Sequence, residues 1–167
     1  MSALRICVLT ISDTRTLDND TSGATLASRL SAAGHVLHER AIVRDDVYAI
    51  RGIVSRWIAE SGPQVIITTG GTGVTGRDGT PEAIAPLLDK QLEGFGELFR
   101  TISFPKIGTS AMQSRCLAGV ANGKYIFCLP GSQDAVETGW DGILKAQLDA
   151  TTKPCNFAQI LGRLSEK

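Results

Sequence analysis

Apolar runs and helical patterns alternate along the chain. Three segments are apolar, or alternate between apolar and polar positions, and end in polar loop residues, a pattern typical of strands; they are residues 5–12, 36–43 and 65–69. Two segments between them, residues 21–34 and 47–58, repeat apolar residues at helical spacing. The third strand, VIITT, has a continuous apolar character with no charged residue, as expected of a central strand in a parallel sheet.

The second half of the chain continues this alternation. In order, the predicted elements are a helix from Thr80, a helix across residues 95–102, strands at 115–119 and 125–129, and a helix after Ser132 with an apolar stripe that reaches Leu148. Asn122 and Gly123 supply a turn between the two strands.

Capping residues mark several helix ends. Gly34 stands where a C-cap glycine belongs. Either Asp45 or Asp46 is placed to cap the second helix, and Thr80 and Ser132 are predicted N-caps of later ones.

The order of the predicted elements defines the fold class. Strand–helix–strand units predict a three-layer α/β/α sandwich with a mostly parallel central sheet. A length of 167 residues fits one domain, predicted over residues 1–167. In such sheets a ligand binds beyond the carboxyl ends of the strands, at a switch in strand order.

Composition excludes several classes of protein. Seventeen basic and seventeen acidic residues give a formal charge of zero, so no nucleic-acid partner is expected. The apolar N-terminal run is too short to span a membrane and has no cleavage pattern, so we expect a cytoplasmic protein without a membrane partner. No cysteine pair has C-x-x-C spacing, and Cys7 and Cys128 are expected to be buried. The two histidines do not suggest a metal cluster.

The strongest motif is the glycine-rich stretch at residues 68–83, TTGGTGVTGRDGTPEA, directly after the third strand. Such a stretch brings several backbone N–H groups close to an anion, and a nearby helix N-terminus adds partial positive charge. We therefore predict phosphate binding here. The alternative is a tight strand-to-helix connection that uses glycine only for its dihedral freedom.

Two familiar motifs do not account for this stretch. Gly71, Gly73 and Gly76 match G-x-G-x-x-G, but they follow the third strand and do not run directly into a helix, as a dinucleotide site requires. A P-loop needs a lysine before Ser or Thr, whereas this chain has Arg77 and Asp78.

Asp78 within the glycine stretch would repel a phosphate unless a cation lay between them. Mg²⁺ is commonly held by one or two carboxylates plus phosphate oxygens. Asp45 ends the second strand, which is expected to neighbour the third, so both aspartates are predicted to face one cleft. Each alone also fits a helix cap or a solvated loop acid.

Three further polar segments also lie at strand ends or in loops and suggest one polar crevice. They are Ser12–Asp13, SRCLAG at residues 114–119 and LPGSQDA at residues 129–135.

Together these motifs resemble one family. ISDTR, TTGGTGVTGRDGTPEA, FGELFR, SRCLAG and LPGSQDA are similar to segments of the molybdenum cofactor biosynthesis protein B and molybdopterin adenylyltransferase family, and QLDATTKPCNF resembles its protein B branch. The resemblance covers nearly the whole chain.

The resemblance implies a molybdopterin-binding fold, assembly into homotrimers or homohexamers, and transfer of AMP from Mg-ATP to the terminal phosphate of molybdopterin. It places the two catalytic, metal-holding aspartates at Asp45 and Asp78. The implied substrate-binding residues are Ser12, Asp13, Thr69, Gly70, Gly71, Thr72, Gly73, Ser114, Arg115, Pro130, Gly131 and Ser132. Arg77 or Arg115 would add positive charge.

Two other functions stay open. Some members of the protein B branch lack the first aspartate and are thought not to adenylylate, so a non-catalytic molybdopterin-binding or assembly protein is the alternative. This chain keeps both aspartates but has Gln133 where the adenylyltransferase branch often has proline. A dinucleotide-dependent oxidoreductase would rest on G-x-G-x-x-G alone.

Overall fold

The computed structural model describes residues 3–166, so positions 1, 2 and 167 of the expected single domain lie outside the described range. The strands in this range are β1 (Arg5–Ile11), β2 (Val36–Val43), β3 (Val65–Thr69), β4 (Lys90–Gln91), β5 (Leu117–Ala121) and β6 (Lys124–Leu129). The α-helices are α1 (Thr21–Ala32), α2 (Val47–Ala59), α3 (Thr80–Ile84), α4 (Glu93–Ile107), α5 (Gln133–Gly139), α6 (Lys145–Gln147) and α7 (Phe157–Ile160). Short 3₁₀ helices form η1 (Ala85–Leu87), η2 (Gly108–Gln113) and η4 (Leu161–Arg163), and a π-helical turn forms η3 (Trp140–Leu144).

The strands form one mixed sheet in the order β2-β1-β3-β6-β5-β4. β2, β1, β3 and β6 are parallel, whereas β5 is antiparallel to β6 and β4 to β5. This confirms the mostly parallel sheet. The expectation that β2 neighbours β3 is wrong, because β1 pairs with both of them. After β1 the chain continues to β2 at one edge of the sheet, and after β3 it continues to β4 at the other edge. The boundary between β1 and β3 is therefore the switch point of the sheet.

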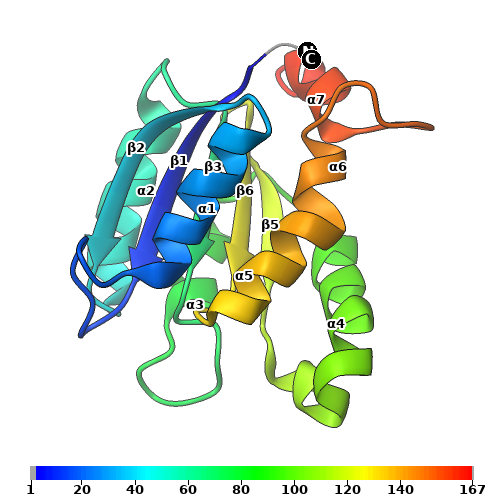
Figure 1. Cartoon of the computed structure of the whole chain (residues 1–167). Coiled ribbons are helices and arrows are strands. Elements are labelled where there is room, and N and C mark those ends of the chain that lie inside the picture. The colour runs from blue at the N-terminus through cyan, green and yellow to red at the C-terminus, as the bar shows by residue number, and fades with distance from the viewer. Residues whose placement is uncertain (1–2, 167) are drawn as a thin grey trace.

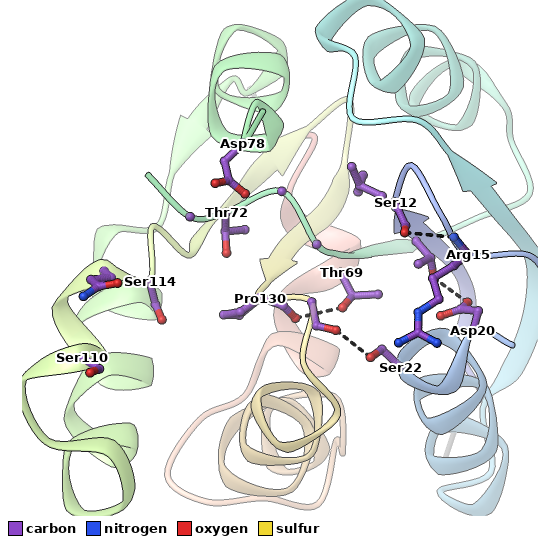
Figure 2. A pocket seen from close by; sticks show the side chains of 17 residues that line it. Ser12, Arg15, Asp20, Ser22, Thr69, Thr72, Asp78, Ser110, Ser114 and Pro130 are labelled. Carbon is purple, nitrogen blue, oxygen red and sulfur yellow. Dashed lines mark hydrogen bonds between the residues drawn. The ribbon is translucent and has the colours of Figure 1, made fainter. Parts of the chain in front are cut away.

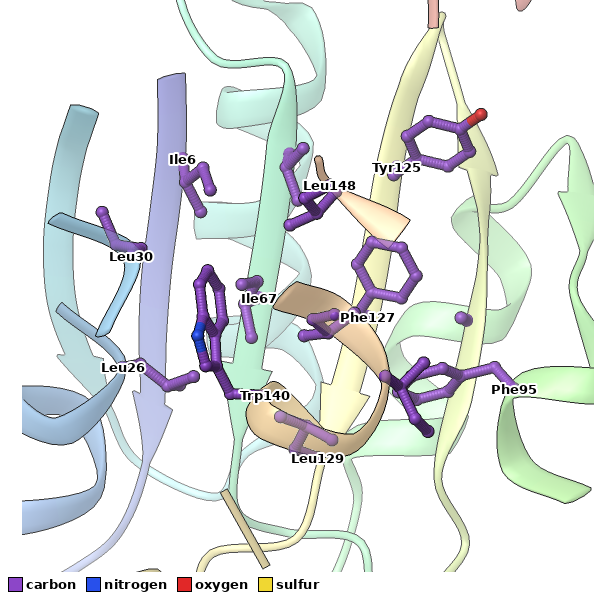
Figure 3. Packing of buried hydrophobic residues seen from close by; sticks show 14 of the residues in the cluster. Ile6, Leu26, Leu30, Ile67, Phe95, Tyr125, Phe127, Leu129, Trp140 and Leu148 are labelled. Atoms are coloured by element: carbon purple, nitrogen blue, oxygen red, sulfur yellow. The ribbon is translucent and has the colours of Figure 1, made fainter. Parts of the chain in front are cut away.

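Helices cover both faces of the sheet and give the predicted three layers (Figure 1). Alternate residues of β1 serve opposite faces: Ile6 and Val8 belong to the apolar cluster under α1, α4 and α5, whereas Cys7 and Leu9 belong to the cluster under α2 and α3. Trp140 is buried in the first cluster, beside β1 and β3 (Figure 3). A strand buried on both faces reads as a continuous apolar run, which is the signal that identified the central strands.

The helix caps agree with the sequence at three ends and differ at one. Gly34 has a φ of +83° just beyond α1, Asp46 caps α2 through a 2.8 Å bond from the Ala49 N–H, and the Ser132 side chain caps α5. The predicted cap at Thr80 is wrong. Thr80 is the first residue of α3, and its hydroxyl donates to the Gly70 carbonyl at 2.8 Å instead.

Two other segments differ from prediction. The first strand of the late hairpin is β5 at Leu117–Ala121, two residues beyond the predicted 115–119, because Arg115 is engaged with the loop after β3. The helix after Ser132 widens into a π-helical turn at Trp140–Leu144 and ends at Gln147. Within residues 3–166, no helix combines the length and apolar character needed to cross a membrane.

Candidate functional site

A polar cavity of about 470 Å³ opens at the carboxyl ends of β1 and β3. The loops after β1, β3 and β6 form most of its wall, and η2 closes the remaining side (Figure 2). The lining residues are Thr10, Ile11, Ser12, Arg15, Asp20, Ser22, Thr69, Gly70, Gly71, Thr72, Gly73, Asp78, Ser110, Gln113, Ser114, Pro130 and Gly131. The cavity lies at the topological switch point, where ligands bind in open α/β sheets.

The first two glycines of the loop after β3 are required by close approach. Gly70 and Gly71 have φ values of +106° and +66°, which L side chains rarely adopt. A Cβ at Gly70 would strike the carbonyl oxygen of Ile11, and a Cβ at Gly71 would lie 2.8 Å from Oδ2 of Asp45. There is thus no room for a side chain at either position, and the backbone itself lines the cavity.

The polar lining is held by bonds between neighbouring loops. The Thr69 hydroxyl donates to the Pro130 carbonyl at 2.9 Å, and the Ser22 hydroxyl donates to the Gly131 carbonyl at 2.7 Å. These contacts bind the loop after β6 to β3 and to the start of α1. Ser114 lines the opposite wall, near the end of η2.

The two predicted catalytic aspartates both adjoin Gly79, Asp45 through a hydrogen bond and Asp78 as the preceding residue. Oδ1 of Asp45 accepts a 3.1 Å bond from the Gly79 N–H, although Asp45 follows β2 and Gly79 precedes α3. Oδ2 of Asp78 accepts bonds from the backbone and hydroxyl of Thr75, at 2.9 and 2.6 Å. Asp78 lines the cavity, whereas Asp45 lies behind Gly71 and does not.

The environments of these two carboxyl groups shift their pKa values in opposite directions. Burial, together with the negative charges of Asp78 and Asp13, raises the pKa of Asp45, although the bond from Gly79 opposes the shift. Hydrogen bonds from the Thr75 side chain and backbone hold the pKa of Asp78 below its usual range. A cation beside Asp45 would relieve the unfavourable ionisation, and paired carboxylates are ligands that suit Mg²⁺.

Besides Asp45, three residues of the predicted site do not line the cavity: Asp13, Arg115 and Ser132. Asp13 forms an ion pair with Arg77, and its other oxygen accepts from the Asp45 N–H at 3.2 Å. Arg115 pairs with Glu82 and donates to the Gly73 carbonyl at 2.7 Å. Ser132 caps α5. The expected extra cations, Arg77 and Arg115, therefore stabilise loops on the outside of the cavity.

Sequence reasoning missed residues on two walls. Arg15, Asp20 and Ser22 come from the loop after β1 and the start of α1, and Ser110 and Gln113 come from η2. Arg15 ends the ISDTR segment, two positions after the predicted site residue Asp13, which was the available signal. Ser110 and Gln113 carry no comparable signal, because isolated polar residues in a loop have no pattern.

The cysteines offer no reactive group near the cavity. Cys7, Cys116 and Cys128 are buried, as predicted for the first and last of them. Burial raises the pKa of the Cys7 and Cys128 thiols to about 12, so both stay protonated. Within the described residues, no three His, Cys, Asp or Glu side chains converge as a metal cluster.

Comparisons with known proteins agree on one family. The family described as "Probable molybdopterin binding domain" matches residues 7–150. The molybdenum cofactor biosynthesis protein B of Escherichia coli (strain K12) is 52% identical over 153 residues, which cover 92% of this chain and 90% of that protein. The protein of the same description from Staphylococcus aureus (strain COL) is 44% identical over 149 residues, covering 87% and 88%.

Solved structures give the same answer. A crystal structure of molybdenum cofactor biosynthesis protein B superposes with a TM-score of 0.90 at 39% identity, over 99% of this chain and 98% of that chain. The tungsten cofactor synthesizing protein MoaB from Pyrococcus furiosus superposes with a TM-score of 0.79 at 34% identity, over 99% of both chains. By its sequence, its fold and its similarity to these proteins, the chain belongs to the molybdopterin-binding domain family of molybdenum cofactor biosynthesis proteins.

Proposed function

We propose that the protein binds molybdopterin in the polar cavity and transfers AMP from Mg-ATP to the terminal phosphate of the pterin. The observation that carries this proposal is the proximity of two carboxylates beside the glycine loop: Asp78 lines the cavity, and Asp45 accepts the N–H of the next residue, Gly79. The family membership supports a molybdopterin ligand. Adenylyl transfer rests on the resemblance and on this geometry.

The proposed reaction brings a phosphate monoester against the α-phosphate of ATP, so most of the barrier is repulsion between anions. Fixed N–H donors, cationic side chains and the Mg²⁺ that accompanies ATP lower such a barrier by neutralising charge and aligning the groups. Asp45 and Asp78 are the residues that would hold Mg-ATP. A phosphate oxygen is already ionised at neutral pH, so the chain needs no general base.

The donor set fits this metal. Mg²⁺ takes oxygen ligands and is usually held by few protein carboxylates together with substrate phosphates. Asp45 is close enough to Asp78 for the second charge to raise its pKa. Both bonds that Asp78 accepts from Thr75 go to the same oxygen, Oδ2.

A second function is favoured by one observation. Asp45 lies behind Gly71 and does not line the cavity, and its carboxylate already accepts the Gly79 N–H. A protein that only binds or delivers molybdopterin would need the cavity and would use Asp45 as a brace between two loops. Both functions share the ligand and differ in turnover.

The experiment that separates them follows the label of α-³²P-ATP into the pterin. Purified protein is incubated with molybdopterin and ATP, with Mg²⁺ or with EDTA, and adenylylated pterin and pyrophosphate are separated by chromatography. We expect both products in equal amounts, only with Mg²⁺, and their loss in Asp78→Asn. Equilibrium binding of molybdopterin without labelled product would establish the binding protein instead.

We further propose that the protein is a cytoplasmic homotrimer or homohexamer. Support comes from large apolar side chains exposed on α4 and η2, namely Leu98, Phe104, Ile107 and Met112. Phe104 and Met112 line one apolar groove, and exposed apolar patches are typical of contact sites. Size-exclusion chromatography with light scattering should give three or six times the monomer mass of 17.7 kDa, and a monomer would contradict the proposal.

A further inference from the structure

The charged residues that line the cavity are few and lie on different walls. Within the described chain, Arg15 is the only basic lining residue, and Asp20 and Asp78 are the acidic ones. Arg15 extends from the loop after β1 toward the cavity, beside Asp20 and Ser22, whereas Asp78 lies beyond Thr72 on the glycine loop (Figure 2). The cavity therefore has a cationic wall and an anionic wall.

The loop after β1 is built to hold Arg15 in this position. The Ser12 hydroxyl accepts the backbone N–H of Arg15 at 3.2 Å, and Nη1 of Arg15 donates to the Asn19 carbonyl at 3.0 Å. The Asn19 side chain in turn accepts the Thr16 N–H at 2.8 Å. One guanidinium nitrogen is thus used to aim the group, and Nε and Nη2 bond to no other described residue.

The neighbouring carboxylate does not cancel this charge. Asp20 is buried and accepts from the Thr10 hydroxyl at 2.7 Å, the Gly23 N–H at 2.9 Å and Nη2 of Arg40 at 2.9 Å. Burial alone would raise the pKa of Asp20, but these bonds hold it below its usual range. The negative charge of Asp20 is therefore compensated by Arg40, and the positive charge of Arg15 remains for a ligand.

The glycine loop offers fewer donors than its sequence suggests. The Gly70 N–H donates to the Leu129 carbonyl at 3.0 Å, and the Gly73 N–H is directed at the Asp78 carboxylate. Among the described residues, the N–H groups of Gly71 and Thr72 make no hydrogen bond. Two neutral N–H donors alone would bind a phosphate dianion weakly, because strong phosphate sites usually also contain a positively charged donor.

We propose that Arg15 is the cation that binds the phosphate group of the ligand, together with the free N–H groups of Gly71 and Thr72. This inference rests on the proposed function and deepens it by assigning the positive charge to Arg15 instead of Arg77 or Arg115. The planar guanidinium matches a phosphate with two parallel donors. The guanidinium lies across the cavity from Asp78. There it would neutralise part of the charge of the acceptor phosphate and so weaken its repulsion of the second anion that Mg-ATP brings.

The test uses inorganic phosphate as the probe, in an NMR titration of the ¹⁵N-labelled protein. We expect chemical-shift changes at the Gly71 and Thr72 amides and at Nε–H of Arg15. Arg15→Gln should weaken phosphate binding about 10- to 100-fold, the range of a hydrogen bond to a charged group. Arg15→Lys, which keeps the charge and loses the fork, should lie between the two. Arg77→Gln is the matched control, because Arg77 is a loop arginine outside the lining, and it should leave the affinity unchanged.

The outcomes separate this inference from the proposed function. Unchanged phosphate affinity in Arg15→Gln, or a loss in Arg77→Gln only, would overturn the assignment even if the wild type forms adenylylated pterin. Weakened binding in Arg15→Gln would uphold it even if the wild type forms no product. In an active wild type, Arg15→Gln should also raise the KM for molybdopterin more than it lowers kcat. Arg15 is exposed, so its variants are expected to fold, which thermal unfolding will verify.

Discussion

The carboxylate of Asp45 accepts a hydrogen bond from the backbone N–H of Gly79 at 3.1 Å, and this contact joins the loop after β2 to the end of the glycine loop. The two loops come from strands that are not neighbours, since β1 lies between β2 and β3. The bond uses one carboxylate oxygen, Oδ1. The other, Oδ2, faces Gly71.

Mutation of the adjacent residues Asp45 and Asp46 should affect different properties, turnover in the first case and stability in the second. Asp45→Asn keeps an oxygen for the Gly79 N–H but removes the charge, so we expect turnover to fall at least about 100-fold, the scale of a lost electrostatic contact to the transition state. Asp46→Ala removes the cap of α2 and should cost about 1 kcal/mol of stability without changing turnover. Steady-state kinetics and urea denaturation of both variants test this. Equal turnover in the two would deny Asp45 a catalytic role.

The stability of Asp45→Asn should depend on pH relative to the wild type. Burial raises the pKa of Asp45 in the folded state above its unfolded value, so ionisation costs folding free energy. Wild-type stability from this group is greatest below its unfolded pKa of about 3.9 and is lost as pH rises through the folded pKa. We therefore expect Asp45→Asn to be at least as stable as the wild type at pH 7 in the absence of Mg²⁺. A destabilised variant in urea titrations at that pH would contradict this.

Gly71 and Gly76 provide a matched pair within one loop. Gly71→Ala places a Cβ at a φ of +66° and against Asp45, so we expect a loss of about 1–3 kcal/mol and weaker phosphate binding. A Cβ at Gly76 meets nothing within 4 Å, and Gly76→Ala should change stability by less than about 1 kcal/mol. Denaturation curves of the two variants measure the difference. Similar losses would show that the loop rearranges to admit a side chain at Gly71.

His35 should make the fold sensitive to mild acid. It is buried, its Nδ1 accepts the Leu4 N–H at 3.3 Å, and burial holds its pKa below the usual value. The unfolded chain therefore binds a proton more readily, so stability is complete above about pH 6.5 and falls as pH drops toward the folded pKa. In His35→Gln this loss should be absent. Urea denaturation at pH 7.5 and 5.5 compares the two, and the same decline in both proteins would assign it to other groups.

Arg115 should stabilise the glycine loop without binding the ligand. It donates to the carbonyls of Gly73 and Asp78, at 2.7 and 3.1 Å, and pairs with Glu82. Arg115→Gln should therefore cost about 1.5 kcal/mol or more, the low end for hydrogen bonds to a charged group. Amide hydrogen exchange should increase across residues 72–79. Unchanged exchange there, combined with weaker phosphate binding, would show that Arg115 contributes to ligand binding and would contradict this prediction.

The fold was predictable where burial leaves a periodic pattern. Central strands such as β3 are buried on both faces, and α2 repeats Ile50, Val54 and Trp57 at helical spacing. The two-residue strand β4 has no pattern of its own, because both residues are exposed and it exists through pairing with β5. The order of the strands also escaped prediction, since it depends on the direction of each crossover.

The candidate site was predictable at the strand ends and less so in the loops. Thr69 is the last residue of β3, and Gly70 and Ser12 directly follow β3 and β1, strands whose ends could be located. Asp13, two positions after β1, and Arg115, two positions before β5, both lie outside the cavity lining and form ion pairs with Arg77 and Glu82. Such pairings join residues tens of positions apart, and a pattern along one chain does not contain them.

The most direct test of the central claim is a single-turnover experiment with enzyme in excess over α-³²P-ATP, at saturating molybdopterin and Mg²⁺. The account predicts that the wild type transfers the label to the pterin with one pyrophosphate released per label, and that Asp78→Asn binds molybdopterin with unchanged affinity but transfers none. Label that stays in ATP with the wild type, while molybdopterin is bound, would contradict adenylyl transfer and identify a molybdopterin-binding protein.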